Sequence, residues 1–183
     1  MPETGVSAHT DPMARIELPA GTLPDVTRAL ALTPRFAEAV GAYEKAVGRS
    51  RLDRRLHELV RMRIAQINEC TLCLAWRNPS WGASESALAA VHDYATSSEF
   101  SPAEKVAIEY AERFCTDSAR IPDSLLARLS EHLGPAGVVE LTLVIGKYLA
   151  MGRFMQVLGL DQDACSIEFD GSGELVVATS THD

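Results

Sequence analysis

Residues 51–67 read RLDRRLHELVRMRIAQI, and this stretch decides the fold class. Its apolar residues recur every three or four positions, which is the spacing of an amphipathic α-helix. The arginines fall between them and are expected on the other side of the helix. The predicted apolar face consists of Leu52, Leu56, Leu59, Val60, Ile64 and Ile67.

The same spacing continues on both sides of this stretch and predicts an all-α protein. Pro24 and Pro34 are each expected to open a short helix, because proline suits the first helical position. The first of these helices should run through Leu32 and the second should stop at Gly48, so that the two form a hairpin.

Two later helix starts are marked by serine caps. Ser84 is expected to cap a helix over residues 85–95. The run from Ser101 to Glu104 combines an N-cap serine, a proline at the first helical position and a capping-box glutamate. These starts predict two further helices after the central stretch.

The last helical region should divide at Gly134. Pro122 or Asp123 opens a helix that this glycine closes. Residues 136–160 then form the longest and most apolar segment of the chain. We therefore predict that 136–160 is the buried central helix.

The two ends of the chain look different from this helical domain, which we place at residues 15–161. Residues 1–14 lack periodicity and predict a disordered lead-in. In the C-terminal tail, residues 162–183, two short β-favouring runs lie on either side of a turn-prone stretch at 170–173. This pattern predicts a short β-hairpin or an extended tail.

The overall composition fits one soluble domain. The chain has 183 residues, of which 46% are hydrophobic, enough for one core. The formal charge of −8 is scattered and disfavours nucleic acid and anionic membranes as partners. No run approaches the ~20 apolar residues of a membrane span, and the N-terminus lacks the apolar segment of a signal peptide. We therefore expect a cytoplasmic protein.

Cys70 and Cys73 form a C-x-x-C pair on a short helix that cannot easily pass Asn78, because Pro79 follows. Two thiols at this spacing share a helix face, and a cysteine at a helix start has a lowered pKa. The pair can be a redox dithiol, half of a zinc site, or inert core. No second C-x-x-C or H-x-x-H follows, so no metal is expected.

The run HELVRMRIAQINECTLC, residues 57–73, resembles the signature of AhpD-like alkylhydroperoxidases, in the carboxymuconolactone-decarboxylase superfamily. Glu58 stands twelve positions before Cys70, and Cys73 follows at the family's spacing. The likeness continues more loosely from Leu23 to Asp161 and includes the ending GRFMQVLGLD. It implies an AhpD-like helical bundle.

The resemblance also implies catalytic roles. Cys73 corresponds to the peroxidatic cysteine, Cys70 to the resolving cysteine, and Glu58 to a base that acts directly or through a water. Glu58 can reach the cysteines only if the chain folds back near Asn68, which is expected to end one helix and cap the next. Without the resemblance, Glu58 reads as half of a solvated ion pair with a nearby arginine.

Arg77 departs from the family pattern, which has histidine at this position. Arginine stays protonated and cannot relay protons. Its guanidinium can instead stabilise a Cys73 thiolate or an anionic substrate group, or it can be an ordinary surface arginine. His57 points about 100° away from Glu58 on a helix and is a poor substitute for the missing histidine.

Together these features predict a thiol-dependent peroxidase or dithiol oxidoreductase that reduces hydroperoxides without a cofactor. The resemblance implies a dihydrolipoyl or other thiol reductant, and trimers or hexamers. One alternative is a lactone decarboxylase-like enzyme of the same fold. Another is a redox sensor or oligomeric protein in which the cysteines switch state without turnover.

Overall fold

The computed structural model describes residues 14–161, 167–169 and 175–177. Nearly all of the predicted lead-in and most of the predicted tail lie outside these ranges. The described chain is predominantly helical, and the all-α prediction is confirmed. Its helices are α1 (Asp25–Ala31), α2 (Pro34–Gly48), α3 (Arg54–Asn68), α4 (Thr71–Ala75), α5 (Glu85–Ala90), α6 (Pro102–Asp117) and α7 (Asp123–Leu158), with short 3-10 helices η1 (Pro79–Trp81), η2 (Val91–Asp93) and η3 (Ser118–Arg120).

The predicted helix starts agree with the structure. Ser84 accepts a hydrogen bond from Ala87 N–H and caps α5. Ser101 and Glu104 form both halves of a capping box at the start of α6. These reciprocal bonds satisfy amides that the helix itself leaves unpaired, so the local sequence fixes both starts.

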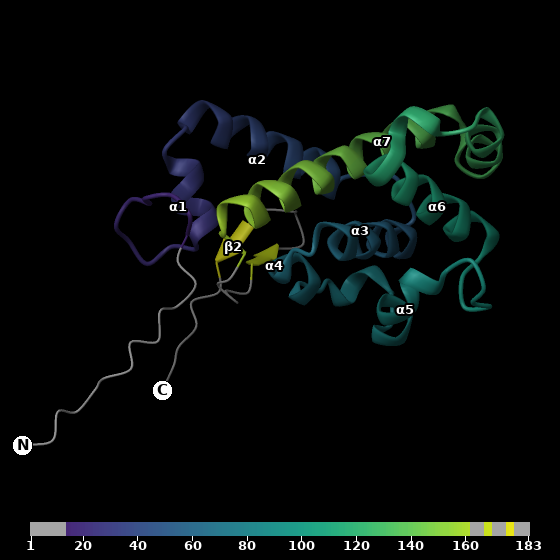
Figure 1. Cartoon of the computed structure of the whole chain (residues 1–183), viewed down its shortest axis with the longest axis horizontal. Helices are drawn as coiled ribbons and strands as arrows, with labels where there is room; N and C mark the ends of the chain where they lie inside the picture. Colours follow the sequence, from purple (N-terminus) through teal and green to yellow (C-terminus); the bar gives the residue numbers. More distant parts are fainter. Residues whose placement is uncertain (1–13, 162–166, 170–174, 178–183) are drawn as a thin grey trace, which may run out of the picture.

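Helix α3 is the buried centre of the fold, and α7 is not. Figure 1 shows α3 between the long α7 and the shorter helices α4 and α5. Nearly every residue from Leu56 to Ala65 is buried, whereas α7 exposes Val139, Leu143 and Val157 by more than half. The prediction that 136–160 is the buried central helix is therefore wrong.

The arginines of α3 explain how this charged helix becomes enclosed. Arg55 pairs with Glu104 of α6 at 2.7 Å, and Arg63 pairs with Glu112 of α6 at 3.1 Å. Arg61 is itself buried. The expectation that the arginines form an outer face is therefore wrong for Arg61, where Glu58 of the same helix compensates the cost of burying the charge.

Helix α7 is two helices joined at Gly134. This residue has φ 66° and ψ 169°, and Pro135 follows it inside the helix, so the predicted division is confirmed. By length and composition α7 is the one described helix that could cross a membrane. It packs along α3 and α6.

The two strands of the predicted C-terminal hairpin pair with each other. β1 (Ile167–Phe169) runs antiparallel to β2 (Leu175–Val177), with Ile167 opposite Val177. The residues between the strands lie outside the described part of the chain.

Helices α3 and α7 approach closely where Asn68 meets Gly152. The Asn68 side-chain amide donates to the carbonyls of Tyr148 at 3.2 Å and Leu149 at 3.5 Å. A Cβ on Gly152 would overlap that amide nitrogen. The glycine therefore allows the last turn of α3, which precedes the cysteines, to dock against α7.

Gly152→Ala is expected to lower the free energy of unfolding by about 2 kcal/mol, because the buried Asn68 must shift. Urea unfolding would measure this loss. The matched control is Gly41→Ala in α2, where a new Cβ meets nothing within 4 Å. Alanine there should stabilise the protein by about 0.5–1 kcal/mol. Equal effects of the two substitutions would contradict the close approach.

Candidate functional site

The chain folds back between α3 and α4, as a role for Glu58 requires. Glu69 adopts a left-handed conformation with φ 53°, and Cys70 N–H donates to Ala65 O at 3.3 Å. Asn68 ends α3 as predicted, but the prediction that it caps the next helix is wrong. Its amide is held by α7, and Cys70 is the N-cap of α4.

Cys70 and Cys73 are joined by a disulfide, with their Cα atoms 5.2 Å apart. This separation lies in the usual range for disulfides. Cys70 is fully buried, whereas Cys73 is half-buried. Cys70 Sγ also accepts a hydrogen bond from Cys73 N–H at 3.3 Å. The pair thus has one enclosed sulfur and one that is closer to solvent.

Glu58 and Arg61 form a buried ion pair beside these cysteines. Arg61 Nε and Nη2 each donate to a different Glu58 oxygen at 2.7 Å. The Glu58 side chain is 1% exposed and the Arg61 side chain is 4% exposed. The alternative reading, an ion pair with a nearby arginine, is therefore correct about the pairing. It is wrong in placing the pair in solvent, because both side chains are buried. A bidentate buried pair of this kind holds both side chains in one geometry.

Arg61 links this ion pair to α4. Its Nη1 donates to the Cys73 carbonyl at 2.6 Å, and its Nη2 donates to the Trp76 carbonyl at 3.2 Å. The Trp76 ring covers the guanidinium at 4.7 Å from its centroid. Glu58 is therefore connected to Cys73 through Arg61. The spacing of three residues between Glu58 and Arg61 was a signal for this pair in the sequence, but nothing there indicated its burial.

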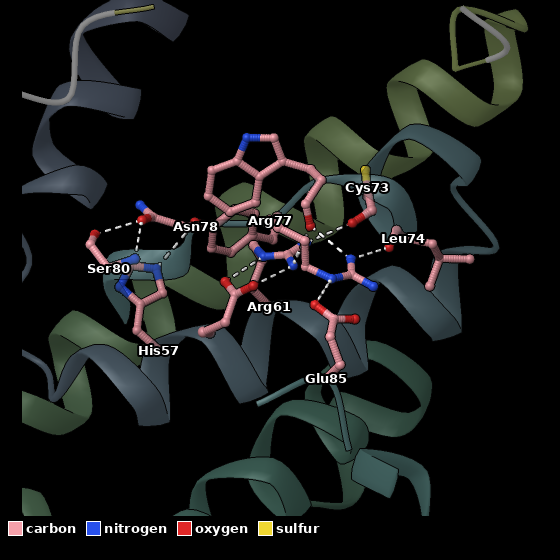
Figure 2. Close-up of polar contacts among 11 residues, drawn as sticks. His57, Arg61, Cys73, Leu74, Arg77, Asn78, Ser80 and Glu85 are labelled. Atoms are coloured by element: carbon pink, nitrogen blue, oxygen red, sulfur yellow. Dashed lines mark hydrogen bonds and ion pairs between the residues drawn. The ribbon is translucent and has the colours of Figure 1, made fainter. Parts of the chain in front are cut away.

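Arg77 also holds the end of α4. Its Nη1 donates to the carbonyls of Leu74 and, at 2.9 Å, Trp76, while its Nε pairs with Glu85 at 2.8 Å. In Figure 2 the Cys73 side chain points away from this guanidinium. Contacts with a thiolate or a substrate stay a prediction for Arg77. In this structure its charge is directed at Glu85, and 34% of its side chain is exposed.

A small cavity of about 230 Å³ brings Glu58 and Arg77 together. Glu58 is enclosed by the fold but reaches this space, whereas the largely exposed Glu85 lies at its rim. The cavity therefore offers room beside the predicted base, although Cys73 does not line it. Its lining residues are Glu58, Arg77, Asn78, Ala83, Glu85 and Leu88.

His57 is buried among aromatic rings. Its Nε2 is 3.1 Å from the Tyr148 hydroxyl, and its ring lies 4.6 Å from that of Trp81. Nδ1 has no hydrogen-bond partner among the described residues. Burial, helped by the nearby charges of Lys147 and Arg54, lowers the pKa of His57 to about 3. The ring is therefore neutral. Trp81, which packs on it, also packs edge-on against Trp76, the ring that covers Arg61.

The pKa of His57 predicts acid sensitivity. The unfolded chain binds a proton near pH 6.5 and the folded chain near 3, so stability is lost as pH falls through this window. Between neutral pH and pH 5, His57 should contribute a loss of about 2 kcal/mol. His57→Phe should flatten the pH dependence of urea unfolding by this amount. A variant with the wild-type pH slope would contradict the burial of a neutral histidine.

Two other charged groups were not anticipated. Lys147 of α7 is buried and pairs with Glu44 of α2 at 2.5 Å, and desolvation lowers its pKa. Asp161 is buried and accepts a hydrogen bond from Thr71 N–H at 3.0 Å. In the sequence, Lys147 is the one lysine within the apolar run 136–160, and this position was a signal that it is buried. No local pattern indicated that Asp161 would reach α4.

Cys115 does not join the site. It is a free, buried cysteine, and burial raises its pKa to about 11. Cys165 lies outside the described residues. Among the residues that the structure does describe, no group of three or more His, Cys, Asp or Glu could hold a metal ion. The absence of a metal in the protein stays a prediction.

Comparison with curated proteins gives two relatives of this chain. YnjA of Escherichia coli K12 is 33% identical over 123 residues, which are 65% of this chain and 68% of YnjA. YdfG of Bacillus subtilis 168 is 29% identical over 120 residues, which are 63% of this chain and 82% of YdfG. Both are uncharacterized proteins. No protein-family model matches the sequence.

Solved structures define the fold. A putative antioxidant defence protein AhpD of unknown function from Agrobacterium tumefaciens superposes with a TM-score of 0.67 at 22% identity, over 80% of this chain and 96% of that one. An uncharacterized peroxidase-related protein from Silicibacter sp. TM1040 superposes with a TM-score of 0.66 at 19% identity, over 85% of this chain and 94% of that one. The fold is therefore AhpD-like, as the sequence predicted. The chain belongs to the same family as YnjA.

Proposed function

We propose that this protein is a thiol-dependent peroxidase, or a closely related dithiol oxidoreductase, which cycles between a dithiol and a disulfide at Cys70 and Cys73. The observation that carries this proposal is the disulfide between a fully buried Cys70 and a half-buried Cys73 at the start of α4. In this proposal the half-buried sulfur meets the substrate and the buried sulfur closes the disulfide afterwards.

The proposed reaction has two steps. The Cys73 thiolate attacks the outer oxygen of a hydroperoxide and the O–O bond breaks. The alkoxide that leaves takes up a proton and becomes an alcohol. Cys73 is then a sulfenic acid. The Cys70 sulfur attacks Cys73, the S–O bond breaks, and water leaves as the disulfide forms. The hydroperoxide is reduced by two electrons and the two thiols are oxidised.

The charged groups around α4 support a thiolate at Cys73. Arg61 donates to the Cys73 carbonyl at 2.6 Å and brings a positive charge to this residue. Nearby cations lower the pKa of a thiol. Glu58 orients Arg61 and also reaches the small cavity. As the proposed base, Glu58 would accept a proton from a group bound in that cavity.

Arg77 could recognise an anionic substrate group in this proposal. It lines the cavity, and its present partner Glu85 is largely exposed. A substrate carboxylate could replace Glu85 on the guanidinium at small cost, because an exposed ion pair is weak. Cofactors and metals have no step in this chemistry.

A second dithiol must reset the enzyme. We propose a dihydrolipoyl or similar thiol reductant, which returns two electrons by thiol–disulfide exchange. The reducing cytoplasm would supply such a partner. Neither nucleic acid nor a membrane has a role in the reaction.

We further propose that the protein acts as a homo-oligomer, a trimer or a hexamer. Val139, Leu143 and Val157 of α7 are each more than half exposed. Burying apolar surface of this kind between subunits would be favourable. Sedimentation equilibrium would measure the assembly directly, and a monomer at micromolar concentration would rule it out.

Steady-state consumption of an organic hydroperoxide, with dihydrolipoamide as the reductant, tests the proposed function. Turnover that depends on both reagents supports it. A disulfide that forms once and is not turned over would favour the redox sensor instead. Unreactive thiols would leave the lactone decarboxylase-like chemistry as the better candidate.

A further inference from the structure

A buried carboxylate lies at the start of α4, beside Cys70. Asp161 is only 3% exposed, and its Oδ2 accepts a hydrogen bond from the Thr71 N–H at 3.0 Å. Thr71 is the first residue of α4 and follows Cys70 directly. The carboxylate therefore lies against the residue next to the buried sulfur.

The end of α7 delivers Asp161 to this place. Gly159 has φ 67° and ends the helix, and Leu160 N–H turns back to donate to Met155 O at 2.9 Å. Leu160 is 1% exposed and belongs to the same small core as Cys70. This arrangement is a helix C-cap with a buried apolar residue after it, which fixes the direction of the chain.

The position of this carboxylate opposes a thiolate on Cys70. The unpaired amides at a helix start favour negative charge, and Cys70 Sγ uses one of them by accepting from Cys73 N–H. Asp161 already brings a negative charge to the same turn. A second negative charge in a buried site is costly, so the carboxylate disfavours a thiolate on the adjacent cysteine.

Positive charge lies on the Cys73 side of the pair. Arg61 contacts the Cys73 carbonyl, although its pairing with Glu58 offsets much of its charge. Other charged groups on the described elements packed here include the Asp25–Arg28 pair of α1, the exposed Glu69 before Cys70, Arg77 at the end of α4, and Arg15, whose side chain donates to Val157 O at the end of α7. A buried carboxylate thus lies next to Cys70, whereas the group that contacts Cys73 is a guanidinium.

We infer that Asp161 is a positioning residue that keeps the reduced Cys70 as a neutral thiol and so assigns the reactive thiolate to Cys73. This inference rests on the proposed dithiol cycle. It explains how two cysteines on one turn take different roles. Burial of Cys70 alone would also disfavour its thiolate, but only the charge of Asp161 can be removed without changing shape.

Asp161→Asn tests the inference, because asparagine keeps an oxygen that can accept from Thr71 N–H and loses the charge. Alkylation of the reduced protein across pH, followed by peptide mass spectrometry, gives the pKa of each thiol. The pKa of Cys70 is expected to fall by about one unit. The variant should shift the dithiol–disulfide equilibrium toward the reduced form only where Cys70 ionises. We expect the equilibrium constant to change by about fivefold at pH 9 and hardly at all at pH 6. Equilibration with a dithiothreitol redox buffer measures that change.

Asp53→Asn is the matched control, since Asp53 caps α3 and accepts from Leu56 N–H at 2.9 Å. It should leave both thiols unchanged. Asp161→Ser provides a second neutral variant if the asparagine variant folds poorly. An unchanged pKa of Cys70, or a redox shift that is equal at pH 6 and pH 9, would overturn the inference. Neither readout uses a peroxide, so a wild-type protein that consumes no hydroperoxide would refute the peroxidase function separately.

Discussion

Replacing Cys73 with serine is expected to lower the rate of hydroperoxide consumption by at least about a thousandfold, because loss of a nucleophile removes the reaction itself. Serine is nearly the same size, so the fold should survive. The measurement is the dihydrolipoamide-dependent loss of an organic hydroperoxide.

Cys70→Ser should abolish turnover but still allow one oxidation of Cys73. Cys73 would still be oxidised once, but no partner would remove its sulfenic acid, so the protein should stop after one equivalent of hydroperoxide. Cys115→Ser is the control, because the Cys115 thiol is buried with a pKa near 11 and should not react. If Cys73→Ser retained turnover and Cys70→Ser lost all reaction, the proposed roles would be reversed.

Glu58→Gln is expected to lower the free energy of unfolding by about 3–5 kcal/mol, the usual cost of leaving one charge of a buried pair without its partner. The Arg61 guanidinium would remain 4% exposed with no compensating carboxylate. Denaturant unfolding at pH 7 measures the loss. The same variant should weaken the hold of Arg61 on the Cys73 carbonyl and slow the reaction of Cys73.

Two further variants separate charge from shape. Asp117→Asn removes a carboxylate from a pair with Arg120 that lies at the surface, where 83% of the arginine side chain is exposed. It should cost about 0.5 kcal/mol at most. The double variant Glu58→Gln/Arg61→Met removes both buried charges and should recover part of the lost stability. Equal effects of Glu58→Gln and Asp117→Asn would show that the Glu58 pair is not buried in solution.

Local signals in the sequence predicted the helices well. Prolines, serine caps and Gly134 act over one turn of chain, so a reader of the sequence can find them. Burial depends on which helices pack together, and composition gave the wrong central helix. The apolar residues 136–160 leave one face exposed, while the arginine-rich α3 is enclosed because carboxylates on α6 meet its charges.

The candidate site was predictable only in part. The spacing of Glu58, Cys70 and Cys73 pointed to residues that the fold does bring near one another. The fold-back itself depends on Glu69, a non-glycine residue in the left-handed conformation, which the sequence did not signal. Asp161 reaches α4 from ninety residues further along the chain, and such a contact is decided by tertiary packing.

The most direct test of the dithiol cycle is peptide mass spectrometry of the reduced protein, labelled with iodoacetamide across pH before and after one equivalent of hydroperoxide. We expect Cys73 to be alkylated at lower pH than Cys70, and the peroxide to convert both into one disulfide that dihydrolipoamide reverses. Thiols that stay unreactive, or that remain reduced after the peroxide is added, would contradict the proposed function.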